Sequence, residues 1–183
     1  MEFFLDIVQY VKRISYTYMV RSAFRNFGSG SKVGNLRRLK GAKNISIGKN
    51  VSIQRDCWLF ALGNKVEPTI QIGDGVSIGF ACALIGCERV CIESNVLIAD
   101  NVHITDNTFV FQDVHKPIKH QELQVVSEVN IGKNSWIGTN VVIIGAKLGR
   151  NCVVAANSVV TANVPDYCVV AGAPAKIIKK IHV

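Results

Sequence analysis

Residues 92–104 read Ile-Glu-Ser-Asn-Val-Leu-Ile-Ala-Asp-Asn-Val-His-Ile, and this stretch decides the fold of the 183-residue chain. An aliphatic residue returns every six positions, at Ile92, Ile98 and Ile104, and a valine stands four places after each of the first two. A six-residue period indicates a solenoid, in which three short strands make one coil and stacked coils bury a continuous aliphatic column. The same phase recurs in 47–53, 72–84, 131–143 and, after one five-residue step, 148–160.

The residues between the aliphatic positions suit the corners of such a coil. They are polar pairs rich in Asn and Gly, which tolerate the backbone conformations of tight turns: Lys49-Asn50, Asp74-Gly75, Ser94-Asn95 and Lys133-Asn134. A β-sandwich would alternate with period two and irregular spacing, and would not keep a six-residue phase. We therefore predict an all-β solenoid, a parallel β-helix over residues 44–183. A basic helical segment over 1–43 precedes it, and a cap over 165–183 closes it.

The repeats, the segment Asn157–Thr161 and the tail Val170-Ala-Gly-Ala-Pro-Ala-Lys176 resemble the hexapeptide-repeat acyltransferases. Within that family the chain looks closest to the maltose, galactoside and capsular-polysaccharide O-acetyltransferases. The resemblance implies a left-handed coil, a homotrimer, acetyl-CoA as cosubstrate without a metal, and a saccharide acceptor, which is often lipid-linked. The implied reaction is acetyl transfer to a sugar hydroxyl in surface-polysaccharide or glycan biosynthesis, in the cytoplasm. N-acetyltransferases of amino sugars and non-catalytic scaffolds share the fold, and both alternatives stay open.

The repeat breaks twice, over 60–70 and over 109–128, and breaks in a solenoid are where function is expected. The first reads as a short hairpin or bulge. In similar enzymes a loop at the second break carries a general-base histidine, because imidazole can take the proton of an attacking hydroxyl. Here Phe109 stands at the usual position of that base. Either the base has moved to His115, or His103 on the coil serves, or the site is disabled.

A histidine base needs a partner that fixes its tautomer and orientation. Asp113, in the same loop, and Asp106, just before it, are the candidate orienters. Aspartate in a loop also commonly stabilises a turn, so that alternative stays open for both residues.

A coenzyme A donor needs a slot lined by small side chains and cations for its phosphates. Small residues recur at matching places on the C-terminal coils, and basic residues follow them. The candidate donor-binding residues are Trp136, Gly138, Ala155, Ala156, Thr161, Ala171, Gly172, Lys176 and Lys179. Trp136 points outward by its phase in the repeat, either beside the ligands or against the 109–128 loop.

Charge is concentrated in the first 43 residues, which hold nine of the 21 Lys and Arg and two of the 13 acids. This basic segment fits an anionic membrane surface, an acidic partner or a solvated arm. No nucleic-acid-binding module is recognisable in the sequence. The six cysteines form no CxxC pair, and the spacing of Cys87 and Cys91, which some zinc sites share, has no His near it. We expect reduced thiols, mostly in the core, in a cytosolic protein.

Residues 3–26 have the periodicity of an amphipathic helix. Its apolar stripe comprises Phe4, Ile7, Val8, Val11, Ile14 and Tyr18. Such a helix either caps the first coil, which is the commoner role, or lies in a membrane interface, peripheral to the inner face of the membrane.

Overall fold

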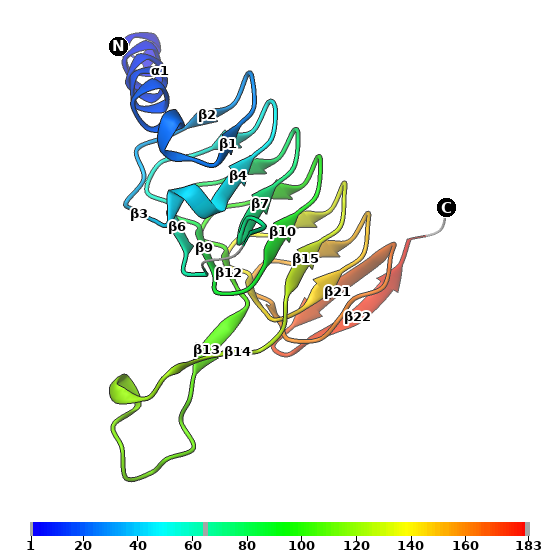
Figure 1. Cartoon of the computed structure of the whole chain (residues 1–183). Helices are drawn as coiled ribbons and strands as arrows, with labels where there is room; N and C mark the ends of the chain where they lie inside the picture. Colours follow the sequence, from blue (N-terminus) through cyan, green and yellow to red (C-terminus); the bar gives the residue numbers. More distant parts are fainter. Residues whose placement is uncertain (1, 64–65, 182–183) are drawn as a thin grey trace.

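The computed structural model describes residues 2–63 and 66–181, with side chains described from Ile7 onward. Three sheets, parallel from coil to coil, wrap around one axis and form the β-helix that the repeat predicted, with the left hand that the family resemblance implied (Figure 1). The first sheet contains β1 (Asn26–Phe27), β4 (Ile45–Ile47), β7 (Ile70–Ile72), β10 (Val90–Ile92), β15 (Val129–Ile131) and β18 (Lys147–Leu148). The second contains β2 (Lys32–Val33), β5 (Ser52–Ile53), β8 (Ser77–Ile78), β11 (Leu97–Ile98), β16 (Trp136–Ile137), β19 (Val153–Val154), β21 (Cys168–Gly172) and β22 (Ala175–Lys180). The third contains β3 (Arg38–Lys40), β6 (Trp58–Ala61), β9 (Ala83–Gly86), β12 (His103–Thr105), β17 (Val142–Ile144) and β20 (Val159–Val160).

The aliphatic positions of the repeat form the core. In the second sheet Ile53, Ile78, Ile98, Ile137, Val154 and Val170 follow one another in register, and all are buried. At the corners, seven asparagines take left-handed φ values, from 52° at Asn151 to 60° at Asn134 and Asn157. The corner asparagines of the repeat therefore adopt the turn conformation that was predicted for them.

The β-helix begins at Asn26, inside the segment predicted to be helix and lead-in, because residues 26–40 already form a complete coil. Phe27, Val33 and Leu39 stand six apart and lead into Ile45. Only Val33 is an aliphatic residue followed by Gly, the pair that makes the later repeats obvious; Phe27 is aromatic, and Leu39 is followed by Lys40. The period was therefore present in the sequence but weakly marked.

The second break in the repeat is an arm. An antiparallel pair, β13 (Asn107–Phe109) and β14 (Leu123–Val125), leaves the end of the fourth coil, and the 3₁₀ turn η3 (Ile118–His120) lies near its tip. Figure 1 shows this arm projecting away from the coil. At the first break, the described residues between β6 and β7 form no additional strand.

The two ends of the coil are covered differently. At the C-terminal end, β21 continues the second sheet and β22 folds back against it in antiparallel register. At the N-terminal end the α-helix α1 (Glu2–Val20), continued by the turn η1 (Arg21–Ala23), packs on the first coil, where a further η2 turn (Ala42–Asn44) precedes β4. No helix in the described part of the chain has the length and apolar content needed to cross a membrane.

The helix contacts the coil through the side that carries Arg13 and Thr17, and Tyr16 and Val20 beside them pack against the core. Thr17 is buried, and its hydroxyl donates to the carbonyl oxygen of Val33 at 3.0 Å and accepts from the Val33 N–H at 2.9 Å. The Arg13 guanidinium donates to Lys32 O, Ser52 Oγ and Ile53 O. The helix therefore covers the first coil, which was one of the two expectations, but the predicted apolar stripe points largely outward. The Phe4 side chain lies outside the described part of the structure.

We predict that Thr17→Val lowers the free energy of unfolding by about 1–3 kcal/mol, because both polar groups of Val33 lose their buried partner. The measurement is urea denaturation followed by circular dichroism. Ser15→Val on the exposed side of the same helix is the control and should cost less than about 0.5 kcal/mol. Equal losses in the two variants would contradict a capping role for Thr17.

Candidate active site

Small residues stack in one column where the second sheet turns into the third. Gly138, Ala155 and Ala171 directly follow Ile137, Val154 and Val170, which are register partners. The Gly138 N–H donates to Val154 O and the Ala155 N–H to Val170 O, so the column follows the coil-to-coil hydrogen bonds. A Cβ on Gly138 would lie 2.7 Å from Ala156 N, so this position requires glycine for the stacking itself. The column has the smooth surface that an extended pantetheine arm requires.

The predicted phosphate partners lie beside this column. On β22, Lys176 pairs with Ala171 and Lys179 pairs with Val169. Both lysines are exposed, and Gly172 lies at the adjoining turn with a φ of 100°. Thr161 follows β20 and lies at the corner between the third and first sheets. The structure therefore brings together all of the donor-binding candidates on this edge except Thr161.

Trp136 lies on the outer surface of the second sheet, with 51% of its area exposed. Its outward orientation confirms the prediction from the repeat phase. Its register neighbours are Leu97 and Val153, and the arm leaves from the third sheet. Trp136 therefore offers an apolar platform next to the corner that carries Gly138.

The arm holds His115 at an exposed position near its tip. The Asp113 carboxylate accepts the backbone N–H of His115 at 3.0 Å, so this aspartate shapes the turn. The buried Gln121 side chain donates to the carbonyl oxygens of Asp113 and Lys116 and closes the tip. Among the interactions that the structure describes, none joins the His115 imidazole to Asp113. The orienting role predicted for Asp113 stays a prediction.

Asp106 is the anchor of the arm. Its carboxylate is fully buried and accepts the backbone N–H groups of Cys87, Glu88 and Arg89 at 2.6–3.0 Å, and its neighbour Asn107 donates at 2.9 Å. The Asp106 carbonyl oxygen accepts the N–H of Val126 on the returning strand. The carboxylate predicted to orient a histidine is thus occupied by the adjacent coil corner, and a turn-stabilising role explains its contacts.

His103 lies on the outer face of β12, between Ala83 and Val142 in register. Burial lowers the pKa of its imidazole, because the charged form loses hydration. His103 is therefore a neutral imidazole at neutral pH, which is the form that accepts a proton. It stands four residues after Ala99, which lies in the small-residue column through its hydrogen bond to Ile137 O.

The outer face of the third sheet is apolar, which was not predicted from the sequence. Outward-facing apolar residues follow one another across its strands at Trp58, Phe60, Ala83, Ile85, Val142, Ile144 and Val159. Arg38 lies over the Trp58 ring at 5.1 Å, and Phe60 stacks on it at 5.9 Å. Outward positions of a solenoid are normally polar, so these side chains were the available signal. The outer face of the third sheet is thus apolar on both sides of His103.

Four of the six free cysteines (Cys57, Cys82, Cys152 and Cys168) are buried, as predicted, and Cys87 and Cys91 are half-buried. A hydrogen bond with Cys82 and burial both raise the pKa of the Cys57 thiol, which keeps it unreactive. In the part of the chain that the structure describes, no three His, Cys, Asp or Glu side chains gather as metal ligands would.

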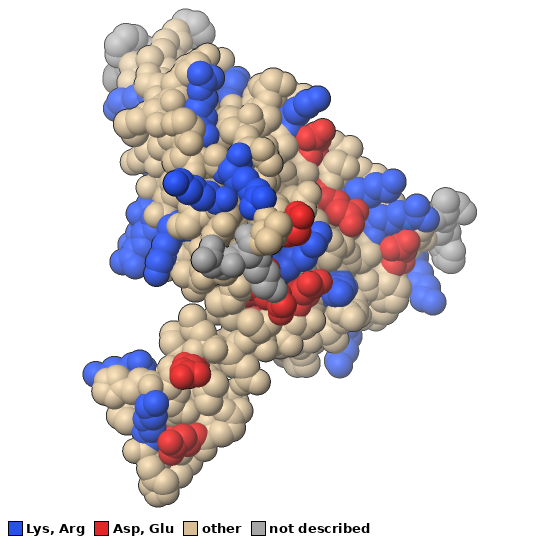
Figure 2. All heavy atoms as spheres, in the orientation of Figure 1, with Lys and Arg blue, Asp and Glu red and all other residues tan. Residues whose placement is uncertain are grey.

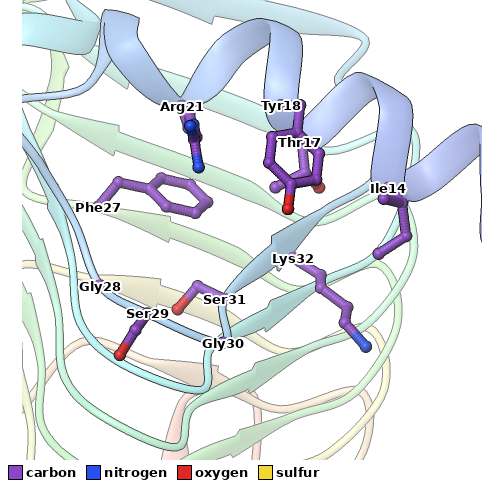
Figure 3. Close-up of a pocket in the computed structure, with 10 residues that line it drawn as sticks. All are labelled: Ile14, Thr17, Tyr18, Arg21, Phe27, Gly28, Ser29, Gly30, Ser31 and Lys32. Carbon is purple, nitrogen blue, oxygen red and sulfur yellow. The ribbon is translucent and has the colours of Figure 1, made fainter.

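Two surface hollows lie away from the small-residue column. One of about 240 Å³ lies between α1 and residues 27–32 (Figure 3), and one of about 390 Å³ lies between Asn130 and Asp166 at the first sheet. In a single chain, the small-residue column, the lysines of β22 and the neutral His103 thus lie on open surfaces.

Comparison with known proteins gives a consistent result. The family model described as the hexapeptide repeat of succinyl-transferase matches residues 128–162. The putative lipopolysaccharide biosynthesis O-acetyl transferase WbbJ of Escherichia coli K12 is 35% identical over 146 residues, which are 76% of this chain and 73% of that protein. The galactoside O-acetyltransferase of the same organism is 31% identical over 138 residues, covering 75% and 64%.

A solved structure agrees with these matches. The hexapeptide-repeat acetyltransferase VCA0836 of Vibrio cholerae, complexed with acetyl-CoA, is 25% identical and has a TM-score of 0.65 over 93% of this chain and 79% of that one. The chain spans from 38% to 73% of the length of the first relatives that it matches.

We predict that Asp106→Asn lowers the free energy of unfolding by about 2–3 kcal/mol, because an amide offers one acceptor oxygen to several N–H donors. Denaturant titration measures the loss. Asp74→Asn is the matched control, since that exposed carboxylate accepts a single N–H from Lys49, and it should cost less than about 1 kcal/mol. A loss no larger than that of the control would contradict the anchoring role.

The lowered pKa of His103 predicts a pH dependence of stability. Below its ordinary pKa of about 6.5 the unfolded chain binds a proton at His103 that the folded chain does not. Stability should therefore rise with pH from the lowered folded pKa up to about 6.5. Urea midpoints at several pH values measure this slope. His103→Gln should flatten it, and an unchanged slope would contradict burial of the imidazole.

Proposed function

Because the chain belongs to the hexapeptide-repeat acyltransferase family, we propose that it transfers an acetyl group from acetyl-CoA to a saccharide hydroxyl in surface-polysaccharide or glycan biosynthesis. The observation that carries this proposal is the column of Gly138, Ala155 and Ala171 with Lys176 beside it. Two relatives bear the names of O-acetyltransferases of lipopolysaccharide biosynthesis and of galactosides, which supports a sugar acceptor.

The residues fit the donor in shape and charge. Small side chains allow an extended arm to approach the backbone, and Lys176 and Lys179 can pair with phosphates. When bound, acetyl-CoA supplies an acyl carbonyl activated by its thioester. The chain itself must hold this group in place and take the proton of the attacking hydroxyl.

We assign proton acceptance to His115, with His103 as its rival. His115 lies on an arm that projects away from its own coil (Figure 1), so it would act at a site completed by a second copy. His103 already lies one strand past the column, and its lowered pKa keeps the imidazole neutral. A neutral imidazole can accept the hydroxyl proton and later give it up.

The proposed assembly is a homotrimer. The outer face of the third sheet is apolar, and the exposed side of the arm carries Phe109, Phe111, Val114, Ile118 and Leu123. Both surfaces would be covered by neighbouring copies, and the arm of one chain would reach the coil of the next. We also propose a cytoplasmic location, which four buried free thiols favour, and a lipid-linked form of the acceptor.

A second candidate function is a non-catalytic scaffold. Phe109 is 51% exposed on β13, where relatives are expected to carry the base, and phenylalanine cannot accept a proton. The N-acetyl transfer alternative differs only in the acceptor, and an amino sugar among the test substrates distinguishes it.

We predict that His115→Ala lowers acetyl transfer to a panel of sugars by about 10²–10⁴-fold with donor binding intact, as expected for loss of a general base. Transfer is followed by thiol release and donor affinity by calorimetry. His120→Ala, an exposed histidine on the same arm, is the control and should retain activity.

The other outcomes separate the alternatives. Loss in His103→Ala alone would move the base to His103. An inactive chain that gains activity in Phe109→His would mean that the base is missing. Absence of donor binding would favour the scaffold. Light scattering on the same preparations gives the assembly, and the mass of one chain would contradict the homotrimer.

A further inference from the structure

Helix α1 turns its apolar side away from the protein. Arg13 and Thr17 face the first coil and bond to it. The opposite side consists mainly of apolar residues: Ile7, Val8, Val11, Tyr18 and Met19. Val11 is 55% exposed, Tyr18 63% and Met19 68%. We call these five residues the outer face of α1.

The outer face of α1 does not pack against the core of its own chain. An amphipathic helix normally buries its apolar stripe against its own protein. Here the first coil presents backbone groups at its open edge, and the helix meets them with polar side chains. The apolar stripe is left for a partner outside this chain, since contiguous exposed apolar surface of this kind marks an interaction site.

The surroundings of the outer face are basic. Lys12 lies on the exposed side of α1, and Arg21 and Arg25 follow at its end. Figure 2 shows Lys and Arg side chains over the helix and the first coils. In the hollow beside the helix (Figure 3), Arg21 and Lys32 line the opening. The Lys32 ammonium and the Arg21 guanidinium also lie over the rings of Tyr10 and Tyr18.

We infer that the outer face of α1 lies in the interface of an anionic lipid bilayer, with Lys12, Arg21 and Arg25 against the lipid headgroups. Apolar side chains on one side of a helix and cations at its border are the two requirements of interfacial binding. Tyrosines suit the boundary between headgroups and acyl chains. A bilayer fits better than a second copy, because two copies packed on this face would bring their own cations together.

Binding of α1 to a bilayer would also fix the orientation of the coil relative to the membrane. The helix covers one end of the coil, so a bilayer bound to it would lie across the coil axis, at the end opposite to β22 (Figure 1). This inference does not rest on acetyl transfer, and attachment can be tested in a protein without activity. If both hold, a lipid-linked acceptor and the enzyme meet on the same surface.

The experiment is flotation of the full chain with vesicles of phosphatidylcholine, with or without roughly 30% phosphatidylglycerol. We expect the protein to float with the anionic vesicles only, and less so at high salt, because salt screens the charge. Val11→Glu combined with Met19→Glu should weaken binding at least about tenfold, since it replaces apolar area with repelled charge.

Two further variants complete the design. Lys12→Gln combined with Arg21→Gln should weaken binding by about fivefold per charge. Ile177→Glu combined with Ile178→Glu adds the same charge on exposed apolar positions of β22, at the other end of the coil, and should bind as the unchanged protein does. Circular dichroism confirms that each variant is folded; the replaced side chains on α1 are exposed.

Three results would overturn the inference. One is no flotation with anionic vesicles. Another is equal flotation of the α1 variants and the β22 variant. The third is a larger assembly in solution that Val11→Glu with Met19→Glu dissociates, without vesicle binding, which would assign the outer face to a second copy of the chain.

Discussion

Everything in this molecule depends on the in-register stacking of one aliphatic side chain per six residues. Ile98, for example, lies between Ile78 and Ile137, and the strands that carry them are hydrogen-bonded in parallel from one coil to the next. Because no single coil buries its own face, the coils are stable only together. Aliphatic side chains therefore fill the interior, and every residue with a function must lie on an outer face, at a corner, on the arm or at an end.

The arm illustrates what an excursion from such a stack requires. The chain leaves the fourth coil and returns to the fifth. The backbone N–H groups at the corner formed by residues 87–89 would otherwise lack a hydrogen-bond partner. The buried Asp106 carboxylate supplies it by accepting three backbone N–H groups, and the Asp106 carbonyl holds the returning strand at Val126. These hydrogen bonds hold both strands of the arm where it leaves the coil.

The sequence predicted the coil well because its period is imposed by backbone geometry, which every coil repeats. It predicted the asparagine corners and the stacked column of Gly138, Ala155 and Ala171 for the same reason. The functional roles were harder, since outward positions carry no periodic constraint. The first coil was not predicted because Phe27 stands where the later repeats have an aliphatic residue. No pattern in the sequence shows against which surface the arm places His115.

The amphipathic pattern of the helix did not predict which side of it faces the coil. The amphipathic rule assumes that the surface under a helix is apolar, but the first coil of a β-helix exposes a row of backbone donors and acceptors. At the far end β22 satisfies that row with its own backbone. At the near end Thr17 and Arg13 satisfy it with side chains, so the polar side of α1 must face inward. Closing the edge in this way leaves Val11 and Met19 in water, and that exposed area costs free energy until a bilayer or another apolar surface covers it.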